Sequence, residues 1–191
     1  MTNTEIAERI LTGQPGAFKE LVEEHQLKVI NTCFRFLNNK EDAEDIAQEV
    51  FLEVHRSIDK FRGEAKLSTW IYRIAVTKSL DFIRKKKRKK RMGHLKRILG
   101  VDEELDKLPA NNMDDPERAL EKEERVKILE EALNSIAENQ RTAIILSKYD
   151  GYSNQEIAEI MDTSISAVES LIHRAKKNLE KKLYYYFKKN L

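Results

Sequence analysis

Apolar residues recur at intervals of three and four positions through most of this chain, a spacing that predicts helices and no strands. The clearest case is the segment from Lys40 to Ile58, preceded by Asn39 as a potential N-cap with Asp42 near its third position. Its apolar positions are Ala43, Ile46, Ala47, Val50, Phe51, Val54 and Ile58. The same periodicity predicts a helix over residues 3–12, a second one that begins near Pro15 and ends at Leu37, and another that begins at Leu67 or Ser68. Four helices that share a core would form a compact first domain.

The second half of the chain predicts another helical group. Pro116 suits the first turn of a helix with Asp115 as its N-cap, and this helix should reach about Ile136. A further helix is expected from Glu138 to Lys148. Residues 92–115 lack periodicity and contain Gly93, Gly100 and Pro109, as a linker does, with a short helix possible around Leu95 to Leu99. The predicted fold is therefore all-α, with two small helical domains, residues 1–91 and 116–191, joined by a flexible linker, residues 92–115.

A helix-turn-helix is predicted after Ser153, which forms a potential capping box with Glu156. Ala158 is small enough for two helices to cross closely, and Val168 and Leu171 would seat the second helix so that its N-terminal part faces a major groove. An ordinary helical hairpin is the alternative. The residues expected to face DNA are Ser153, Gln155, Ser164, Ser166, Ala167, Ser170, His173 and Arg174.

Charge is unevenly distributed, although the net charge of the 191 residues is only +2. Residues 84–101 contain ten basic and no acidic side chains, whereas residues 102–124 contain ten acidic and three basic ones. This asymmetry indicates a polyanionic partner. The basic run follows a polar loop and Trp70, and aromatic faces beside cations suit single-stranded nucleic acid. The alternative is that Trp70 belongs to the core and the basic run is a solvated helix end.

Several classes of protein and site are disfavoured by the sequence. Cys33 is the only cysteine, so a disulfide framework is excluded. The N-terminus lacks the pattern of a secretion signal, and no apolar run approaches the roughly 20 residues of a membrane span, so we expect a cytoplasmic protein without membrane insertion. No glycine-rich phosphate loop occurs, and the four histidines lack metal-ligand spacing with Cys33. We therefore expect no enzyme, no metal and no cofactor.

Three stretches in this order resemble the extracytoplasmic-function (ECF) class of the bacterial sigma-70 family. They read DAEDIAQEVFLEVHRSIDKFRG (residues 42–63), LSTWIYRIAV (67–76) and YSNQEIAEIMDTSISAVESLIHRAKKNL (152–179), and the similarity covers nearly the whole chain. The resemblance implies a transcription initiation factor that binds core RNA polymerase, directs it to promoters through −10 and −35 elements and nucleates melting. The implied partners are core polymerase, through its β′ clamp helices and β flap, promoter DNA and an anti-sigma factor.

The resemblance also implies roles for individual residues. For −10 recognition and melting these are Phe61, Arg62, Lys66, Ser68, Thr69, Trp70, Tyr72 and Arg73. For polymerase binding they are Asp42, Asp45, Ile46, Gln48, Glu49 and Phe51; the alternative is that the acidic face of this helix is a well-capped surface. The −35 element would be read by the helix-turn-helix residues named above. The basic run is denser than the family requires. We expect phosphates of duplex DNA to bind at Lys78, Arg84, Lys85, Lys86, Lys87 and Arg88.

Two positions depart from the family pattern. Asp162 stands in the helix-turn-helix turn where glycine is frequent, and Glu169 places a negative charge on the recognition helix. Two other functions remain as alternatives. A conventional helix-turn-helix regulator would explain the second domain but not the acidic helix or the aromatic loop, and a purely protein-binding helical module would explain neither nucleic-acid motif.

Overall fold

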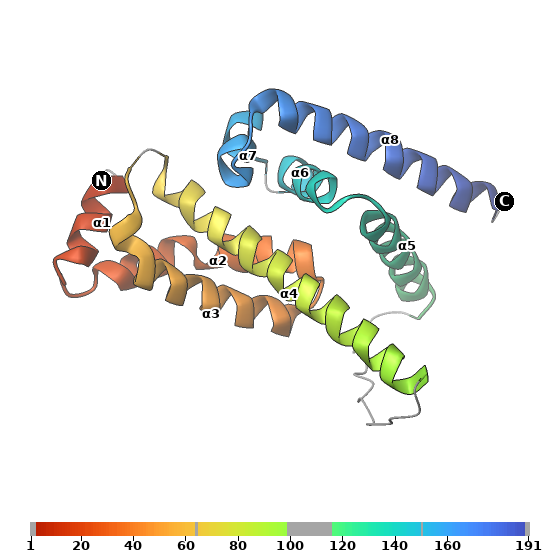
Figure 1. Cartoon of the computed structure of the whole chain (residues 1–191), viewed down its shortest axis with the longest axis horizontal. Coiled ribbons are helices and arrows are strands. Elements are labelled where there is room, and N and C mark those ends of the chain that lie inside the picture. The colour runs from red at the N-terminus through yellow and green to blue at the C-terminus, as the bar shows by residue number, and fades with distance from the viewer. Residues whose placement is uncertain (1–2, 64, 99–115, 150, 190–191) are drawn as a thin grey trace.

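The computed structural model describes residues 3–63, 65–98, 116–149 and 151–189, and every regular element in them is helical, as the periodicity predicts (Figure 1). The elements are α1 (Asn3–Leu11), α2 (Ala17–Leu37), α3 (Lys40–Ser57), a 3₁₀ turn (Ile58–Lys60), α4 (Leu67–Ile98), α5 (Pro116–Ser135), α6 (Glu138–Tyr149), α7 (Asn154–Met161) and α8 (Ile165–Lys189). Among these residues, no helix combines the length and the apolar character needed to cross a membrane.

Helices α1 to α4, here called the N-terminal helices, share a core built by α2, α3 and α4. The predicted cap of α3 is confirmed, because the Asn39 side chain accepts a hydrogen bond of 2.8 Å from the backbone N–H of Asp42. The predicted apolar face of α3 is buried, whereas its acidic face is mostly exposed. The cap sets where this helix begins, and burial of one face sets which side lies on the core.

Helix α4 begins at Leu67, as predicted, but it is longer than expected. Residues 92–98, predicted as the start of the linker with a short helix possible around Leu95, instead continue α4 through Gly93 to Ile98. A single glycine costs a helix only about 1 kcal/mol, and the next proline is Pro109. The remainder of the predicted linker, residues 99–115, lies outside the described residues.

Helices α5 to α8, here called the C-terminal helices, begin at Pro116, as predicted. The capping box at the start of α7 is also confirmed, with Ser153 and Glu156 bonding each other's backbone N–H. At the end of α7, Asp162 adopts the left-handed conformation with φ 54°. Aspartate is one of the few residues other than glycine that tolerate this conformation, so the turn keeps its geometry without a glycine.

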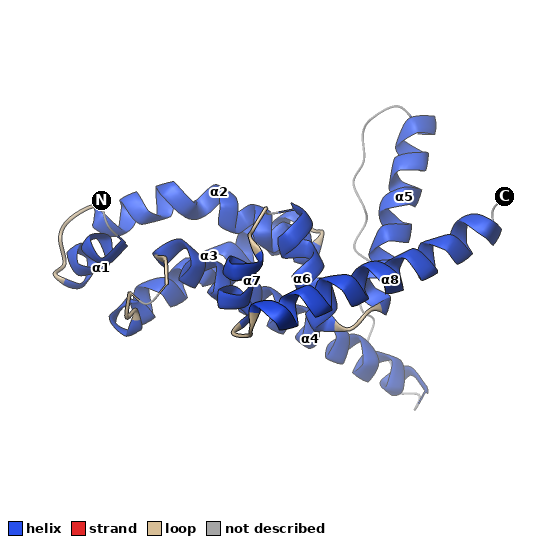
Figure 2. Ribbon diagram, turned by 90° about the horizontal axis from the view of Figure 1, so that it is seen from above, coloured by secondary structure: helices blue, strands red, loops and turns tan. Residues whose placement is uncertain are grey.

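The two groups of helices pack against each other, with α7 against α4 and α6 against α2 (Figures 1 and 2). Lys28 of α2 places its ammonium 4.9 Å from the ring centroid of Tyr72 and 4.5 Å from that of Tyr152. Arg141 of α6 donates a 2.8 Å hydrogen bond to the backbone carbonyl of Phe36. Carbonyls in the last turn of a helix lack an intrahelical partner and attract cations, so Arg141 anchors α6 to the end of α2.

Candidate nucleic-acid interface

The predicted base-handling stretch presents two aromatic rings beside a tight loop. Phe61 follows the 3₁₀ turn and is held by a hydrogen bond from its N–H to the carbonyl of Ile58. The centroids of the Phe61 and Trp70 rings are 5.6 Å apart, and the two ring planes are tilted by 50° to each other. Both side chains are half-buried, so each packs one side on the core and keeps part of its surface accessible, as a base-stacking platform requires.

The polar residues of this stretch have different surroundings. Arg62 is exposed and Ser68 is half-buried, whereas Thr69 and Tyr72 are 4% and 3% exposed. Tyr72 lies in the interior beside His25, with its hydroxyl 3.4 Å from the ring Nδ1. Burial of His25 lowers the pKa of its imidazole, so the neutral ring is favoured in this contact. In this arrangement Thr69 and Tyr72 support the site from within the core, and their contact with DNA stays a prediction.

Two cations of the base-handling stretch are paired with the C-terminal helices. The guanidinium of Arg73 lies 2.7 Å from the Asp162 carboxylate, and the Lys66 ammonium lies 3.5 Å from that of Glu156. Glu156 lies in the first turn of α7 and Asp162 follows its end. The residues predicted to handle the −10 element therefore contact the first helix of the predicted −35 reader.

The predicted phosphate-binding residues fall into two sets. One set is paired with carboxylates: Lys78 with Glu49 and Glu53, Lys86 with Asp42, and Arg84 with Asp81 and Glu138. The other set is exposed, and within the described part of the chain its members have no carboxylate in ion-pair range: Lys85, Lys87 and Arg88. The second set can meet phosphates without first breaking a contact inside the chain.

The predicted polymerase-binding residues of α3 are divided by the helical period. Asp45, Gln48 and Glu49 are exposed and Asp42 is half-buried, so a partner can reach them. Ile46 and Phe51 are 4% and 9% exposed and belong to the core. These two support the α3 surface from below rather than form it, and any direct contact with polymerase stays a prediction.

The predicted recognition helix, α8, is capped by Ser164, whose hydroxyl accepts a 3.2 Å hydrogen bond from the N–H of Ala167. Val168, Ile172 and Ala175 are buried at helical spacing. The opposite face is exposed at Ser166, Glu169, Ser170, His173 and Arg174, with Ala167 half-buried at its edge. Before α7, Ser153 is exposed and Gln155 donates to Glu159 over 3.5 Å. The predicted −35 residues of α8 thus share one side of that helix, and Ser153 and Gln155 are exposed separately at the start of α7.

The capping box of α7 gives a testable contribution to stability. Ser153→Ala removes the acceptor of the 3.2 Å hydrogen bond from the Glu156 N–H and should lower the free energy of unfolding by about 1 kcal/mol. The backbone N–H of Ser153 holds the pKa of the Glu156 carboxyl below its ordinary 4.5. A lowered pKa stabilises the fold above the ordinary value and loses that effect as the pH falls through the lowered one. Urea melts from pH 6 to 3 should therefore show a weaker acid dependence for Glu156→Gln; an unchanged dependence would contradict this.

Some contacts of the site carry no signal in the sequence. The pairs Arg73–Asp162 and Lys66–Glu156 join residues about 90 positions apart, which periodicity cannot relate.

Among the described residues, no group of three or more His, Cys, Asp or Glu side chains is placed to bind a metal ion. The buried Cys33 has a pKa raised to about 11 by burial, which leaves its thiol unreactive at neutral pH.

Comparison with known proteins now gives this geometry a family. Residues 21–89 match the model of sigma-70 region 2, and residues 127–179 match that of sigma-70 region 4. The chain is 33% identical to the ECF RNA polymerase sigma-E factor of Haemophilus influenzae, with 96% of each covered. It is 32% identical to the sigma-E factor of Escherichia coli, over 96% of this chain and 95% of that one.

Two solved structures share the fold. The CnrH chain, solved in complex with the cytosolic domain of CnrY, superposes with a TM-score of 0.66 at 22% identity, covering 96% of this chain and 97% of CnrH. The sigma factor RpoE of Bartonella quintana, solved with the anti-sigma factor NepR, gives a TM-score of 0.60 at 22% identity, covering 88% of this chain and 98% of RpoE. With regions 2 and 4 both matched and relatives at about one-third identity along its length, the chain belongs to the ECF subfamily of the sigma-70 RNA polymerase sigma factors.

Proposed function

We propose that the chain acts at a promoter through three separate surfaces. The exposed acidic face of α3 binds the β′ clamp helices of core polymerase. The stretch from Phe61 to Arg73 captures unpaired bases of the −10 element, and the exposed face of α8 reads the −35 element as duplex. The observation that carries this division is the Phe61–Trp70 pair, two accessible rings 5.6 Å apart between an acidic helix and a basic one.

The proposed work at the −10 element needs no covalent chemistry. Unstacking and unpairing a base costs a few kcal/mol of free energy, and stacking each freed base on an aromatic side chain contributes about 1–3 kcal/mol of binding free energy. One or two captured bases therefore suffice to nucleate melting. On this account the chain is not an enzyme, and it acts in the cytoplasm, where the polymerase is.

The arrangement of the helices bears on when the proposed contacts form. Elements named −10 and −35 are centred about 25 base pairs apart, which is about 85 Å of B-form DNA at 3.4 Å per base pair. Lys66 of the proposed −10 site lies 3.5 Å from Glu156 in the proposed −35 reader. One chain in this closed arrangement cannot span both elements, so we infer that the C-terminal helices separate from the N-terminal helices before both elements are bound.

We also propose that an anti-sigma factor regulates this chain. The support is that RpoE, which has the same fold, was solved in complex with the anti-sigma factor NepR.

We further propose that the chain consists of a first domain (residues 1–91), a linker (92–115) and a second domain (116–191). The end of the first domain then lies inside α4, which continues to Ile98.

Reconstitution with core polymerase tests the proposal. On a promoter from the chain's own genome, the holoenzyme should give run-off transcripts and permanganate-reactive thymines in the −10 element. Core binding without thymine reactivity would remove the melting role and leave the docking role. Tight, specific binding of the promoter duplex by the chain alone, with no core binding, would favour a conventional helix-turn-helix regulator.

The basic end of α4 gives a quantitative prediction. Arg88 is exposed and unpaired among the described residues, so Arg88→Ala should remove one phosphate contact and reduce the slope of log affinity against log salt by about 0.9. Lys86 already bonds Asp42 at 2.9 Å, and Lys86→Ala should reduce the slope less. Filter binding of holoenzyme to promoter DNA from 50 to 200 mM salt measures both slopes. Equal slopes for both variants would show that the Asp42 pair does not limit Lys86.

A further inference from the structure

Glu169 is an acidic residue in the middle of the α8 face that is proposed to read the −35 element. Its side chain is exposed, and Ser166 and His173, three and four positions away, are its exposed neighbours on that face. Residues 165–179 contain no other acidic residue but three basic ones, Arg174, Lys176 and Lys177. The phosphates of DNA repel a carboxylate, so a glutamate on a DNA-facing surface calls for a physical reason.

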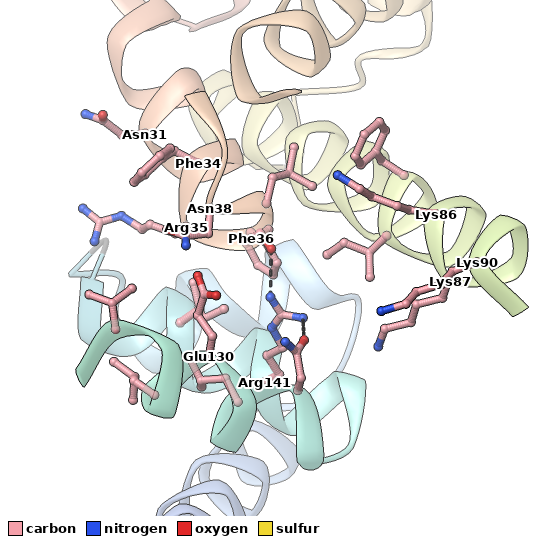
Figure 3. Close-up of a pocket in the computed structure, with 18 residues that line it drawn as sticks. Asn31, Phe34, Arg35, Phe36, Asn38, Lys86, Lys87, Lys90, Glu130 and Arg141 are labelled. Carbon is pink, nitrogen blue, oxygen red and sulfur yellow. Dashed lines mark hydrogen bonds between the residues drawn. The ribbon is translucent and has the colours of Figure 1, made fainter. Parts of the chain in front are cut away.

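The Glu169 carboxylate is available to a partner outside the protein. Several other carboxylates of the C-terminal helices have a cation beside them: Glu138 has Arg84, Glu156 has Lys66 and Asp162 has Arg73. Glu130 likewise lies close to Arg141, in a groove between α2, α4, α5 and α6 (Figure 3). Within the described part of the chain, no cation lies in ion-pair range of Glu169. The guanidinium of Arg174 instead donates a 3.2 Å hydrogen bond to the carbonyl of Ser170.

The edges of the bases decide what a carboxylate can bind in a major groove. A carboxylate accepts hydrogen bonds and donates none, and the donors there are the N4 amino group of cytosine and the N6 amino group of adenine. Adenine places its N7 acceptor beside N6, where it repels a second acceptor, whereas cytosine presents its amino group without one. Guanine and thymine present acceptors only, apart from the thymine methyl group. Cytosine is therefore the base that suits Glu169 best.

An exposed apolar side chain stands beside this carboxylate. Ile165, the first residue of α8, is 47% exposed and precedes Glu169 by one turn, so the two lie on the same side of the helix. The N-terminal residues of a recognition helix are the ones that contact base edges. An apolar side chain gains nothing from a phosphate, but it can contact the methyl group of thymine. This side of α8 therefore suits base edges rather than the DNA backbone.

We propose that Glu169 determines specificity at one position of the −35 element, where its carboxylate accepts a hydrogen bond from the N4 amino group of a cytosine. The inference rests on the proposed function, because it needs α8 to lie in the major groove. At another base the carboxylate meets an acceptor, and the phosphates still repel it. Glu169 therefore lowers the affinity for wrong sequences as well as selecting the right one, while the exposed Lys176 and Lys177 hold the backbone.

Replacement of Glu169 should switch the preferred base rather than only weaken binding. Holoenzyme made with core polymerase selects bound fragments from a duplex library in which the −35 element of a promoter from the chain's own genome is randomised. The wild type should enrich cytosine at one position by about five-fold or more. Glu169→Gln should prefer adenine at that position, because glutamine pairs with N6 and N7 together, and Glu169→Arg should prefer guanine through O6 and N7.

Glu180 provides the matched control. It is exposed and follows Glu169 by about three turns, or about 16 Å, on the same side of α8. Glu180→Gln makes the same change of charge away from the N-terminal turns of the helix and should leave every base preference unchanged. An unchanged preferred base in both Glu169 variants would overturn the proposal. A uniform gain of affinity for all sequences in these variants, with no switch of base, would also overturn it by showing general repulsion only.

A modified base tests the proposed hydrogen bond directly. N4-methylcytosine keeps Watson–Crick pairing but carries a methyl group in place of the N–H that faces the major groove. At the selected position it should weaken binding of wild-type holoenzyme about five-fold and change binding of the Glu169→Ala holoenzyme much less, because the acceptor is already absent. Equal losses for the two proteins would mean that another side chain contacts this amino group, and the role of Glu169 would be wrong.

The same selection separates failure of this inference from failure of the proposed function. If the wild type prefers no base at any −35 position, or if Ser170→Ala and Arg174→Ala leave every preference intact, α8 does not read the element and both proposals fail. If Arg174→Ala alters the preferences and neither Glu169 variant does, only the inference about Glu169 is wrong. Thermal unfolding of the Glu169 variants should match that of the wild type, since substitutions at exposed sites change stability little.

Discussion

Trp70→Ala should weaken open-complex formation about five- to 150-fold, the range that corresponds to losing one stacked base at about 1–3 kcal/mol. Binding of the same holoenzyme to the promoter as closed duplex should change much less. The reason is that the indole, half-buried against Phe61, is proposed to stack on an unpaired base, which a closed duplex does not present. Permanganate reactivity of the −10 thymines measures opening, and filter binding at a temperature too low for melting measures closed-duplex affinity.

Two controls separate stacking from folding. Trp70→Phe keeps an aromatic face and should recover most of the opening, whereas Trp70→Leu keeps apolar bulk without that face and should not. Thermal unfolding of each variant reports the packing that Trp70 also provides beside the core. Equal losses of opening and of closed-duplex binding in Trp70→Ala would remove the base-capture role and leave Trp70 as a core residue.

Local features of the fold were predictable because they depend on neighbours in the sequence. Helical periodicity identified the buried face of α3, and the caps at Asn39 and Ser153 are confirmed because each side chain accepts a hydrogen bond from a backbone N–H three residues later. The linker was predicted to begin at residue 92, whereas α4 continues to Ile98, because a lone glycine is a weak stop signal. Here the loss of apolar periodicity after Arg91 marked the end of a packed face, not the end of the helix.

Contacts between the N-terminal and C-terminal helices were not predictable, for a physical reason. In the sequence, Arg73, Lys66 and Lys28 look like any other cations, and their partners are set by how the two groups of helices pack together. Surface ion pairs contribute only about 0–1 kcal/mol each to stability, so they can form without any pattern in the neighbouring sequence that would predict them. The assignment of individual residues to DNA or polymerase came from family resemblance, and the structure adds that Thr69, Tyr72, Ile46 and Phe51 are buried.

Locking the closed arrangement should abolish promoter opening. In the double variant Arg73→Cys, Asp162→Cys, the two thiols replace groups that lie 2.7 Å apart, and a bismaleimide with a reducible disulfide in its linker should bridge them. The native thiol does not interfere, because Cys33 is 0% exposed and burial raises its pKa to about 11. Run-off transcription and thymine reactivity should fall in proportion to the bridged fraction, since a bridged chain cannot span the about 85 Å between the two promoter elements.

Reduction of the linker makes the comparison internal. It separates the two helical groups but leaves both cysteines modified, so recovery of transcription after reduction is caused by separation and not by restoring Arg73. The same reagent on Lys19→Cys, Glu23→Cys, an exposed pair one turn apart on α2, bridges nothing between the groups and should leave transcription unchanged. Full promoter opening by the bridged Arg73–Asp162 variant would show that both elements can be bound in the closed arrangement, and the separation inferred from the Lys66–Glu156 and Arg73–Asp162 contacts would then be wrong.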